Sequence, residues 1–252
     1  MSFAVRARPL FAALALFASS ALAETKELAS YRDFDVGSLK DTWVVFDVDN
    51  TLLRQDHEVG THQWGDYIRE EEVRRGVPVE QATQLQHAYF QILQPFVKVV
   101  PVESDIHRVL YSIRQARVPL FALTARSLGM AGITQQQLAK NGMDFEWSFP
   151  RLRPGAEASL RPHLFRGILF SGDVPKGELL KRVVEGHGHR PKRIVFVDDR
   201  QYNLDSIEKS FAGGPIEILG LRYGGADAKV KGFDPLKAKR EWAAFLRDGR
   251  LP

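Results

Sequence analysis

The chain has 252 residues, of which 44% are hydrophobic and 26% charged, so it is long enough to bury a sizeable core. It contains no cysteine, which excludes disulfides, thiolate catalysis and cysteine-based zinc sites. Its formal net charge of +4 is a weak bias, and we expect no nucleic-acid partner from it.

The first 23 residues have the pattern of a secretory signal peptide. Arg6 and Arg8 precede a short apolar run, and small residues at Ala21-Leu22-Ala23 come before Glu24. The apolar run is too short to cross a bilayer. We therefore expect a signal peptide over residues 1–23, an exported and soluble periplasmic protein, and no membrane span after its removal. The alternative is an uncleaved N-terminal anchor.

Short runs of β-branched and aromatic residues alternate with helical patterns along residues 24–252, which we expect to form one domain. The expected strands cover residues 42–48, 118–123, 167–170, 193–197 and 216–221, and residues 24–40 are expected to form a polar lead-in. Strands that alternate with helices favour parallel connections. The pattern therefore predicts an α/β fold with a doubly wound, mostly parallel, Rossmann-like sheet.

Two regions outside this alternation carry clear helix signals. Residues from about 54 to 100 predict a helical insertion, in which Thr61 begins one helix and residues 76–78 separate it from the next. A final amphipathic helix is framed by Asp234, Pro235 and Gly249.

Polar side chains follow three of the expected strands, where each strand ends. Asp47 and Asp49 are two residues apart and start on the same side of their strand, and Thr51 follows them. Thr124 ends the second strand, and the neighbouring acids Asp198 and Asp199 end the fourth. Because the carboxyl ends of parallel strands share one edge of a sheet, these groups are expected to converge there. For the first motif alone, solvated acids at a strand end are the alternative.

Lys176 opens the helix after the third strand and would bring a cation to the same edge. Crowded carboxylates repel one another unless a cation compensates them, and Mg²⁺ prefers oxygen ligands and phosphate. Four acids, a lysine and a hydroxyl around one space therefore favour an Mg²⁺ ion that clamps a phosphoryl group. Arg126 and Arg200 adjoin these residues and either reach phosphate or form salt bridges within the fold.

In this order the motifs resemble those of the haloacid dehalogenase (HAD) superfamily. They read Phe46-Asp47-Val48-Asp49-Asn50-Thr51, then Leu123-Thr124, then Lys176, then Val197-Asp198-Asp199. A finer resemblance is to an exported bacterial HAD-like family of undefined function, through residues 62–64, 123–126, 196–200 with Asn203, and 222–226. The first resemblance implies a HAD-like fold and, over the insertion, a helical cap.

The resemblance also implies a role for each motif residue. Asp47 would be the nucleophile and Asp49 the general acid/base. The substrate-binding residues would be Thr51, Thr124 and Lys176. Thr51 would brace the loop, Thr124 would hydrogen-bond a phosphoryl oxygen, and Lys176 would hold Asp47 and the phosphoryl charge. The implied Mg²⁺ ligands are Asp47, Asp49 through its backbone carbonyl, Asp198 and Asp199.

These observations together predict an Mg²⁺-dependent phosphomonoester hydrolase that forms an aspartyl phosphate on a small phosphorylated substrate. Two alternatives remain open at this point. One is an exported HAD-fold binding or scaffold protein with little or no turnover. The other is transfer of the phosphoryl group to an acceptor other than water. Neither the substrate nor the oligomeric state follows from the sequence.

Overall fold

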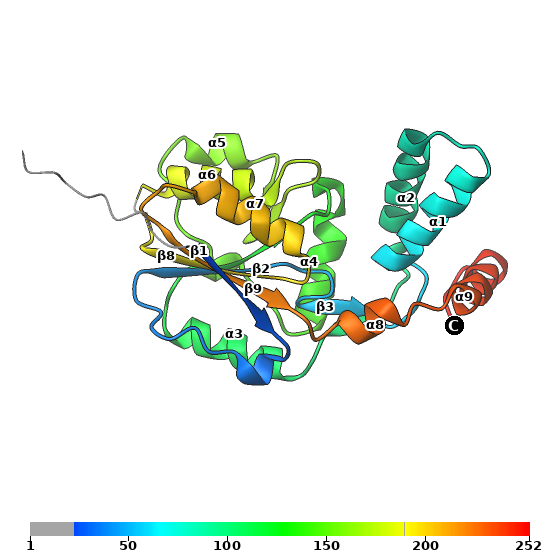
Figure 1. Cartoon of the computed structure of the whole chain (residues 1–252), viewed down its shortest axis with the longest axis horizontal. Coiled ribbons are helices and arrows are strands. Elements are labelled where there is room, and N and C mark those ends of the chain that lie inside the picture. Colours follow the sequence, from blue (N-terminus) through cyan, green and yellow to red (C-terminus); the bar gives the residue numbers. More distant parts are fainter. Residues whose placement is uncertain (1–22, 189) are drawn as a thin grey trace, which may run out of the picture.

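The computed structural model describes residues 23–188 and 190–252 (Figure 1). Its centre is a seven-stranded sheet in the order β1–β9–β8–β2–β5–β7–β6. All neighbouring pairs are parallel except the last, in which β6 runs antiparallel to β7. The strands are β1 (Ala23–Leu28), β2 (Thr42–Phe46), β5 (Leu120–Thr124), β6 (Leu164–Phe165), β7 (Ile168–Phe170), β8 (Arg193–Asp198) and β9 (Glu217–Tyr223). The predicted α/β class with a mostly parallel, Rossmann-like sheet is confirmed.

Both faces of the sheet are buried, which explains why its central strands read as continuous apolar runs. In β2, Val44 and Phe46 belong to the core on the side of α3 (Asp105–Gln115) and α4 (Ala131–Lys140). Trp43 and Val45 belong to the core on the side of α6 (Lys176–His187) and α7 (Gln201–Phe211). Figure 1 shows α3 on one face of the sheet and α6 and α7 on the other.

The predicted insertion is a helical hairpin carried on a small two-stranded sheet. Strands β3 (Leu53–Gln55) and β4 (Val99–Pro101) pair antiparallel. In the sequence they flank α1 (His62–Arg74) and α2 (Val79–Leu93), so the two strands form the base of the hairpin. The Thr61 side chain accepts a hydrogen bond from the Trp64 backbone N–H, so the predicted N-cap of α1 is confirmed. Residues 76–78 separate the two helices, as predicted.

The C-terminal helix packs against this hairpin and away from the central sheet. After α8 (Asp227–Lys231), helix α9 (Pro235–Asp248) begins at Asp234, whose side chain accepts from two backbone N–H groups, and ends at Gly249. We call α1, α2 and α9 the lateral lobe, which stands beside the sheet in Figure 1. The lobe has an apolar core of its own, made by Val59, Trp64, Leu93, Val97, Ala238 and Trp242.

The expected polar lead-in over residues 24–40 is wrong in part. Its start forms β1, which pairs in parallel with β9 along six residues, from Ala23 opposite Ile218 to Leu28 opposite Tyr223. A 3₁₀ turn at Tyr31–Asp33 follows. Only Leu28 of β1 is buried, so this edge strand depends on backbone pairing and carries little apolar signal. Further short elements are α5 (Ala156–Leu160) and 3₁₀ turns at Leu128–Met130 and Glu146–Ser148.

The predicted signal peptide lies outside the described residues except for Ala23. Within residues 23–188 and 190–252, no helix has both the length and the apolar character needed to cross a membrane.

Candidate active site

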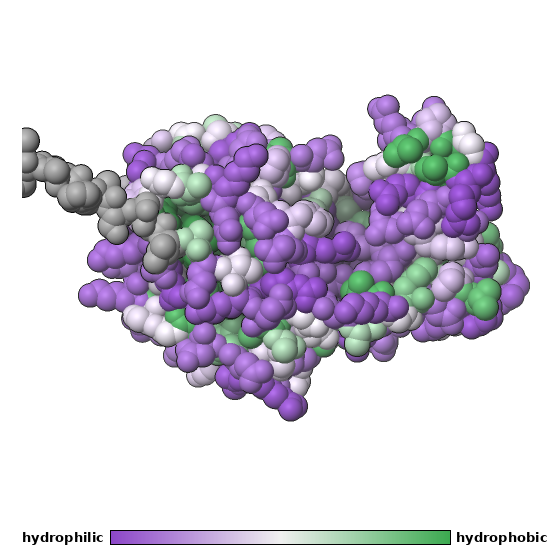
Figure 2. All heavy atoms as spheres, in the orientation of Figure 1, coloured by the Kyte–Doolittle hydropathy of each residue, from purple (hydrophilic) through white to green (hydrophobic). Residues whose placement is uncertain are grey.

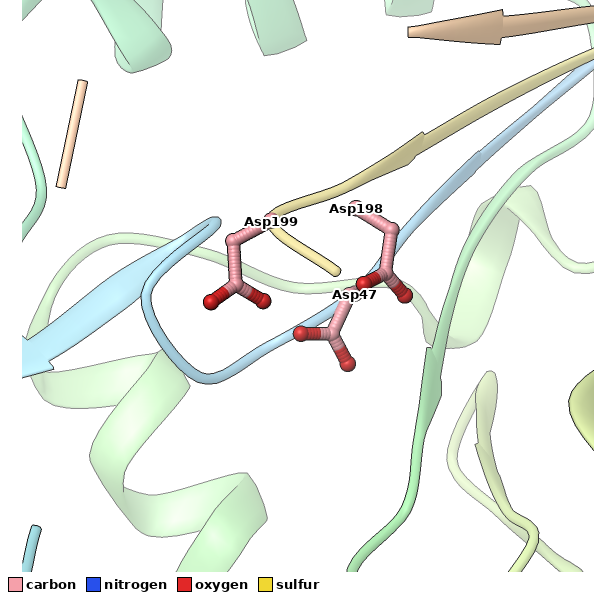
Figure 3. Close-up of side chains that lie close together, drawn as sticks. All are labelled: Asp47, Asp198 and Asp199. Carbon is pink, nitrogen blue, oxygen red and sulfur yellow. The ribbon is translucent and has the colours of Figure 1, made fainter. Parts of the chain in front are cut away.

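Three aspartates meet where β2 and β8 end (Figure 3). Asp47 directly follows β2, Asp198 is the last residue of β8, and Asp199 comes next. One carboxylate oxygen from each lies within 4.8 Å of the others, and all three side chains are buried. The Asp47 N–H donates to the Val197 carbonyl at 2.8 Å, which holds the two strand ends together. The predicted convergence of these acids is thus present in the fold.

Lys176 lies between two of these acids. Its Nζ donates to Asp47 Oδ1 at 2.5 Å and to Asp198 Oδ2 at 2.7 Å, and the side chain is buried at the start of α6. Asp198 also accepts from Asn203 Nδ2 and from the Arg200 backbone N–H. Both of its oxygens are therefore fixed in direction.

The buried charges set the electrostatics of the site. Burial raises the pKa of Asp47, and its acidic neighbours add to this against the opposing effect of Lys176. Burial and Asp198 raise the pKa of Asp199 to about 6. Burial alone would lower the pKa of Lys176, but Asp198 and Asp47 together raise it. Lys176 contacts only two of the three carboxylates, and the third, Asp199, has Arg200 at 3.4 Å. Three carboxylates thus face two cations, and their oxygen ligands and remaining negative charge fit a hard divalent cation.

Asp49 stands apart from this cluster because Arg126 holds it. Arg126 Nε and Nη2 donate to the two carboxylate oxygens at 2.8 and 2.7 Å, and both side chains are buried. Burial alone would raise the pKa of Asp49, but Arg126, with His62, holds it well below its ordinary value. The side chain is therefore ionised and engaged, and only its backbone carbonyl remains for the implied metal contact.

Arg126 is fixed in turn by a buried polar network. Its Nη1 donates to Thr134 Oγ1 at 3.0 Å and to Gln137 Oε1 at 2.7 Å, both on α4. Its Nη2 approaches Gln94 Oε1, just after α2, at 3.4 Å. Of the two readings that the sequence allowed for Arg126, the structure shows the salt bridge. Arg200 likewise pairs with Asp199, at 3.4 Å.

A cavity of about 40 Å³ opens among most of the predicted residues, and Asp47, Asp49, Thr124, Lys176 and Asp199 line it. Thr51 does not. Its hydroxyl accepts from the Asp199 N–H at 3.1 Å, and its carbonyl accepts from Tyr31 Oη. Asn50 makes this turn possible with a φ of +60°, which asparagine tolerates better than most residues. The fold thus gives Thr51 a bracing position between two loops.

Sequence reasoning gave no role to three further residues at the site. His62, Tyr202 and Asn203 line the same cavity, and His62 Nε2 lies 3.8 Å from Asp49 Oδ2 while its ring stacks on Phe90. Asn203 lies five positions after Asp198, in the first turn of α7. His62 comes from the insertion, and no local pattern ties it to the strand ends.

Comparison with known proteins gives a family but no activity. The chain is 25% identical over 228 residues to a Chlamydia pneumoniae protein named "Putative outer membrane protein", covering 90% of this chain and 84% of that one. A Chlamydia trachomatis protein with the same name is 21% identical over 181 residues, 72% of this chain and 68% of the relative. No solved structure matches. A model of a protein family of unknown function matches residues 22–247, and the chain therefore belongs to that family, DUF2608.

Proposed function

We propose that this protein is a HAD-type phosphomonoester hydrolase that depends on Mg²⁺ and forms an aspartyl phosphate on Asp47. The observation that carries the proposal is the contact of Lys176 with both Asp47 and Asp198 inside a buried three-carboxylate cluster. A structural ion pair needs one acid for one lysine. An excess of buried acids at the carboxyl edge of a parallel sheet is costly without a bound cation, and such edges are where α/β proteins bind ligands.

Each residue has a role in the proposed reaction. Asp47 attacks the phosphorus while the bond from phosphorus to the alcohol oxygen breaks, and the electron pair leaves with that oxygen. Lys176 holds Asp47 in place, and Thr124, on the wall of the same cavity, donates to a phosphoryl oxygen. An Mg²⁺ ion held by Asp47, Asp198 and Asp199, with the Asp49 carbonyl, would neutralise phosphoryl charge.

Asp49 acts on protons in this scheme. In the second step water attacks the phosphorus, the water proton passes to Asp49 and the bond to Asp47 breaks. Asp49 is ionised, as this step requires, but it is a weak base while Arg126 holds both of its oxygens, so Arg126 must release it first. Protonating the leaving alcohol in the first step is harder for it, because the carboxyl group must first gain a proton.

The same ion pair favours a second candidate. If Arg126 never releases Asp49, the site would bind phosphate or a phosphorylated ligand with little turnover. The protein would then be a binding or scaffold protein on the same fold. Transfer of the phosphoryl group to an acceptor other than water remains open beside hydrolysis, because both use the same aspartyl phosphate.

Two further features belong to the proposal. We take α1 and α2 as the cap that the HAD resemblance implies, because His62 of α1 reaches the catalytic cavity. We also take the protein to be exported and periplasmic. The signal-like start of the chain supports this, and the names of the Chlamydia relatives are compatible with it.

Hydrolysis of p-nitrophenyl phosphate by residues 24–252 tests the function. We expect turnover with Mg²⁺, its loss with EDTA, and a decrease on the order of a thousandfold or more in Asp47→Asn. Asp33→Asn, at an exposed aspartate that lines neither the catalytic cavity nor its neighbour, is the matched control and should behave as wild type. A folded protein that binds phosphate but turns over no ester would favour the binding protein.

A further inference from the structure

A second cavity adjoins the catalytic one. It has a volume of about 420 Å³ and lies between the lateral lobe and the carboxyl edge of the sheet. His62, Ala125, Arg200 and Tyr202 line both cavities, so these side chains form the boundary between the two. Figure 2 shows the surface hollowed between the lobe and the main body, with mostly hydrophilic residues around the hollow.

The sizes of the two cavities indicate which part of a substrate each one can hold. The catalytic cavity, at about 40 Å³, holds little more than one water-sized group. A phosphoryl group bound at Asp47 would fill it. The alcohol part of the ester must then extend past His62 and Arg200 into the larger cavity.

The larger cavity carries two carboxylates that are only weakly compensated. Asp66 of α1 and Asp173, in the loop after β7, line it, and Asp173 is exposed with no ion pair among the described residues. Asp66 accepts from Gln86 at 2.9 Å and has only a loose contact, 3.7 Å, with Arg69.

The cations around the cavity are already engaged. Its described lining contains two guanidinium groups and no lysine. Arg126 is bound to Asp49 by two hydrogen bonds, and Arg200 lies 3.4 Å from Asp199. A second anionic group on a ligand would therefore meet the two carboxylates of the cavity, and only Arg200, by turning from Asp199, could compensate it.

Polar and apolar groups make up the rest of the lining. Gln86, Gln91 and Ser127 supply amide and hydroxyl groups, His87 supplies an imidazole, and Phe90 and Met130 supply apolar surface. Amides and carboxylates together are suited to accept and donate hydrogen bonds with hydroxyl groups.

We propose that the larger cavity binds the alcohol part of the substrate and that this alcohol is hydroxylated and carries no second anionic group. The inference rests on the proposed function and narrows its substrate to monophosphates of small neutral polyols. It excludes bisphosphates and phosphorylated hydroxy acids as good substrates.

Glycerol 3-phosphate and 3-phosphoglycerate form a matched pair of probes, because they differ mainly in one carboxylate. We would measure kcat/KM for both with excess Mg²⁺ at pH 8, where an ordinary imidazole is neutral. Wild type should prefer glycerol 3-phosphate by about tenfold or more, since a like charge several ångströms away at high effective dielectric weakens binding severalfold.

Two variants test whether the preference for glycerol 3-phosphate arises from the carboxylates of the cavity. Asp66→Asn and Asp173→Asn should each reduce the ratio of the two kcat/KM values by about threefold, and the double variant should nearly abolish it. Asp33→Asn makes the same charge change on a remote exposed surface and should leave the ratio unchanged. Asp173 lies in an exposed loop, so its variant should fold even if Asp66→Asn does not.

The outcomes separate this inference from the proposed function. Equal or faster cleavage of 3-phosphoglycerate overturns the inference, as does a preference that neither variant changes. So does cleavage of p-nitrophenyl phosphate without cleavage of glycerol 3-phosphate. If no ester is cleaved at all, p-nitrophenyl phosphate included, the proposed function fails and the inference falls with it.

Discussion

Arg126 holds the carboxylate of Asp49 by two hydrogen bonds, of 2.8 and 2.7 Å, although the two residues are 77 positions apart. The pair is buried, and Arg126 is itself anchored to α4 and to the end of α2. The residue expected to move protons is therefore firmly held, with both of its carboxylate oxygens bound by Arg126. Its ion pair also links the lateral lobe to the sheet.

A double-mutant cycle should show strong coupling between these two residues. Asp49→Asn and Arg126→Met each leave one buried charge uncompensated, which costs about 3–5 kcal/mol of unfolding free energy. The double variant should lose at least about 2 kcal/mol less than the sum of the two, measured by urea unfolding in EDTA. The exposed pair Glu178 and Arg182 serves as control, with a coupling of about 0.5 kcal/mol or less. Additive losses at the buried pair would contradict the prediction.

Binding of Mg²⁺ should depend on pH through Asp199. Its pKa in the folded protein is raised to about 6, so between about pH 4 and 6 the folded state holds a proton that the unfolded state has lost. The metal-free fold should therefore lose stability from this group as pH rises through that window. Asp47 shifts in the same direction.

The bound metal should reverse this trend, because it competes with those protons. We would use one Mg²⁺ concentration, about a hundredfold above its Kd at pH 7.5. It should raise Tm by about 5–10 °C at pH 7.5 and by much less at pH 5, where binding is weaker. Thermal unfolding with Mg²⁺ and with EDTA at both pH values measures the effect. An equal shift at pH 5 would argue against a carboxylate site, and Ca²⁺ in place of Mg²⁺ tests the preference for the smaller ion.

Thr51 should act on the site through the loop that it braces. Thr51→Val removes the acceptor of the buried Asp199 N–H and should cost about 1–3 kcal/mol of unfolding free energy. It should also weaken Mg²⁺ binding, since Asp199 loses its anchor. Thr51→Ser keeps the hydroxyl and is the matched control. If the valine variant binds Mg²⁺ as wild type does but loses affinity for phosphate, Thr51 contacts the substrate instead.

Glu241 should hold the C-terminal helix to the insertion. Its Oε2 accepts from the backbone N–H groups of Glu58 and Val59 at 2.8 and 2.9 Å, and the side chain is buried. Glu241→Ala leaves both donors without a partner and should cost about 1–3 kcal/mol for each. Hydrogen exchange at these two amides should accelerate. Glu241→Gln retains an acceptor oxygen and should lose less; equal protection in all three proteins would contradict this contact.

The sequence by itself determined the parts of the protein that local pattern encodes. Residues 42–46, 120–124 and 193–198 are apolar on both faces because helices cover both sides of their strands, and such runs are recognisable without a structure. The proximity of Asp47, Asp198 and Lys176 could be predicted because the carboxyl ends of parallel strands lie at one edge of a sheet. Caps such as Thr61 and Asp234 were equally local.

Only the tertiary structure decided which groups meet across long separations. The edge strand β1 has one buried residue and forms through pairing with β9, and α9 has an amphipathic pattern that does not say what it packs against. Arg126 pairs with Asp49 and not with phosphate, and this likewise depends on where the side-chain amides of α4 and of the residue after α2 lie. The physical reason is common to all three. Sequence periodicity records that a side chain is buried or charged, whereas its partner is set by how distant segments pack.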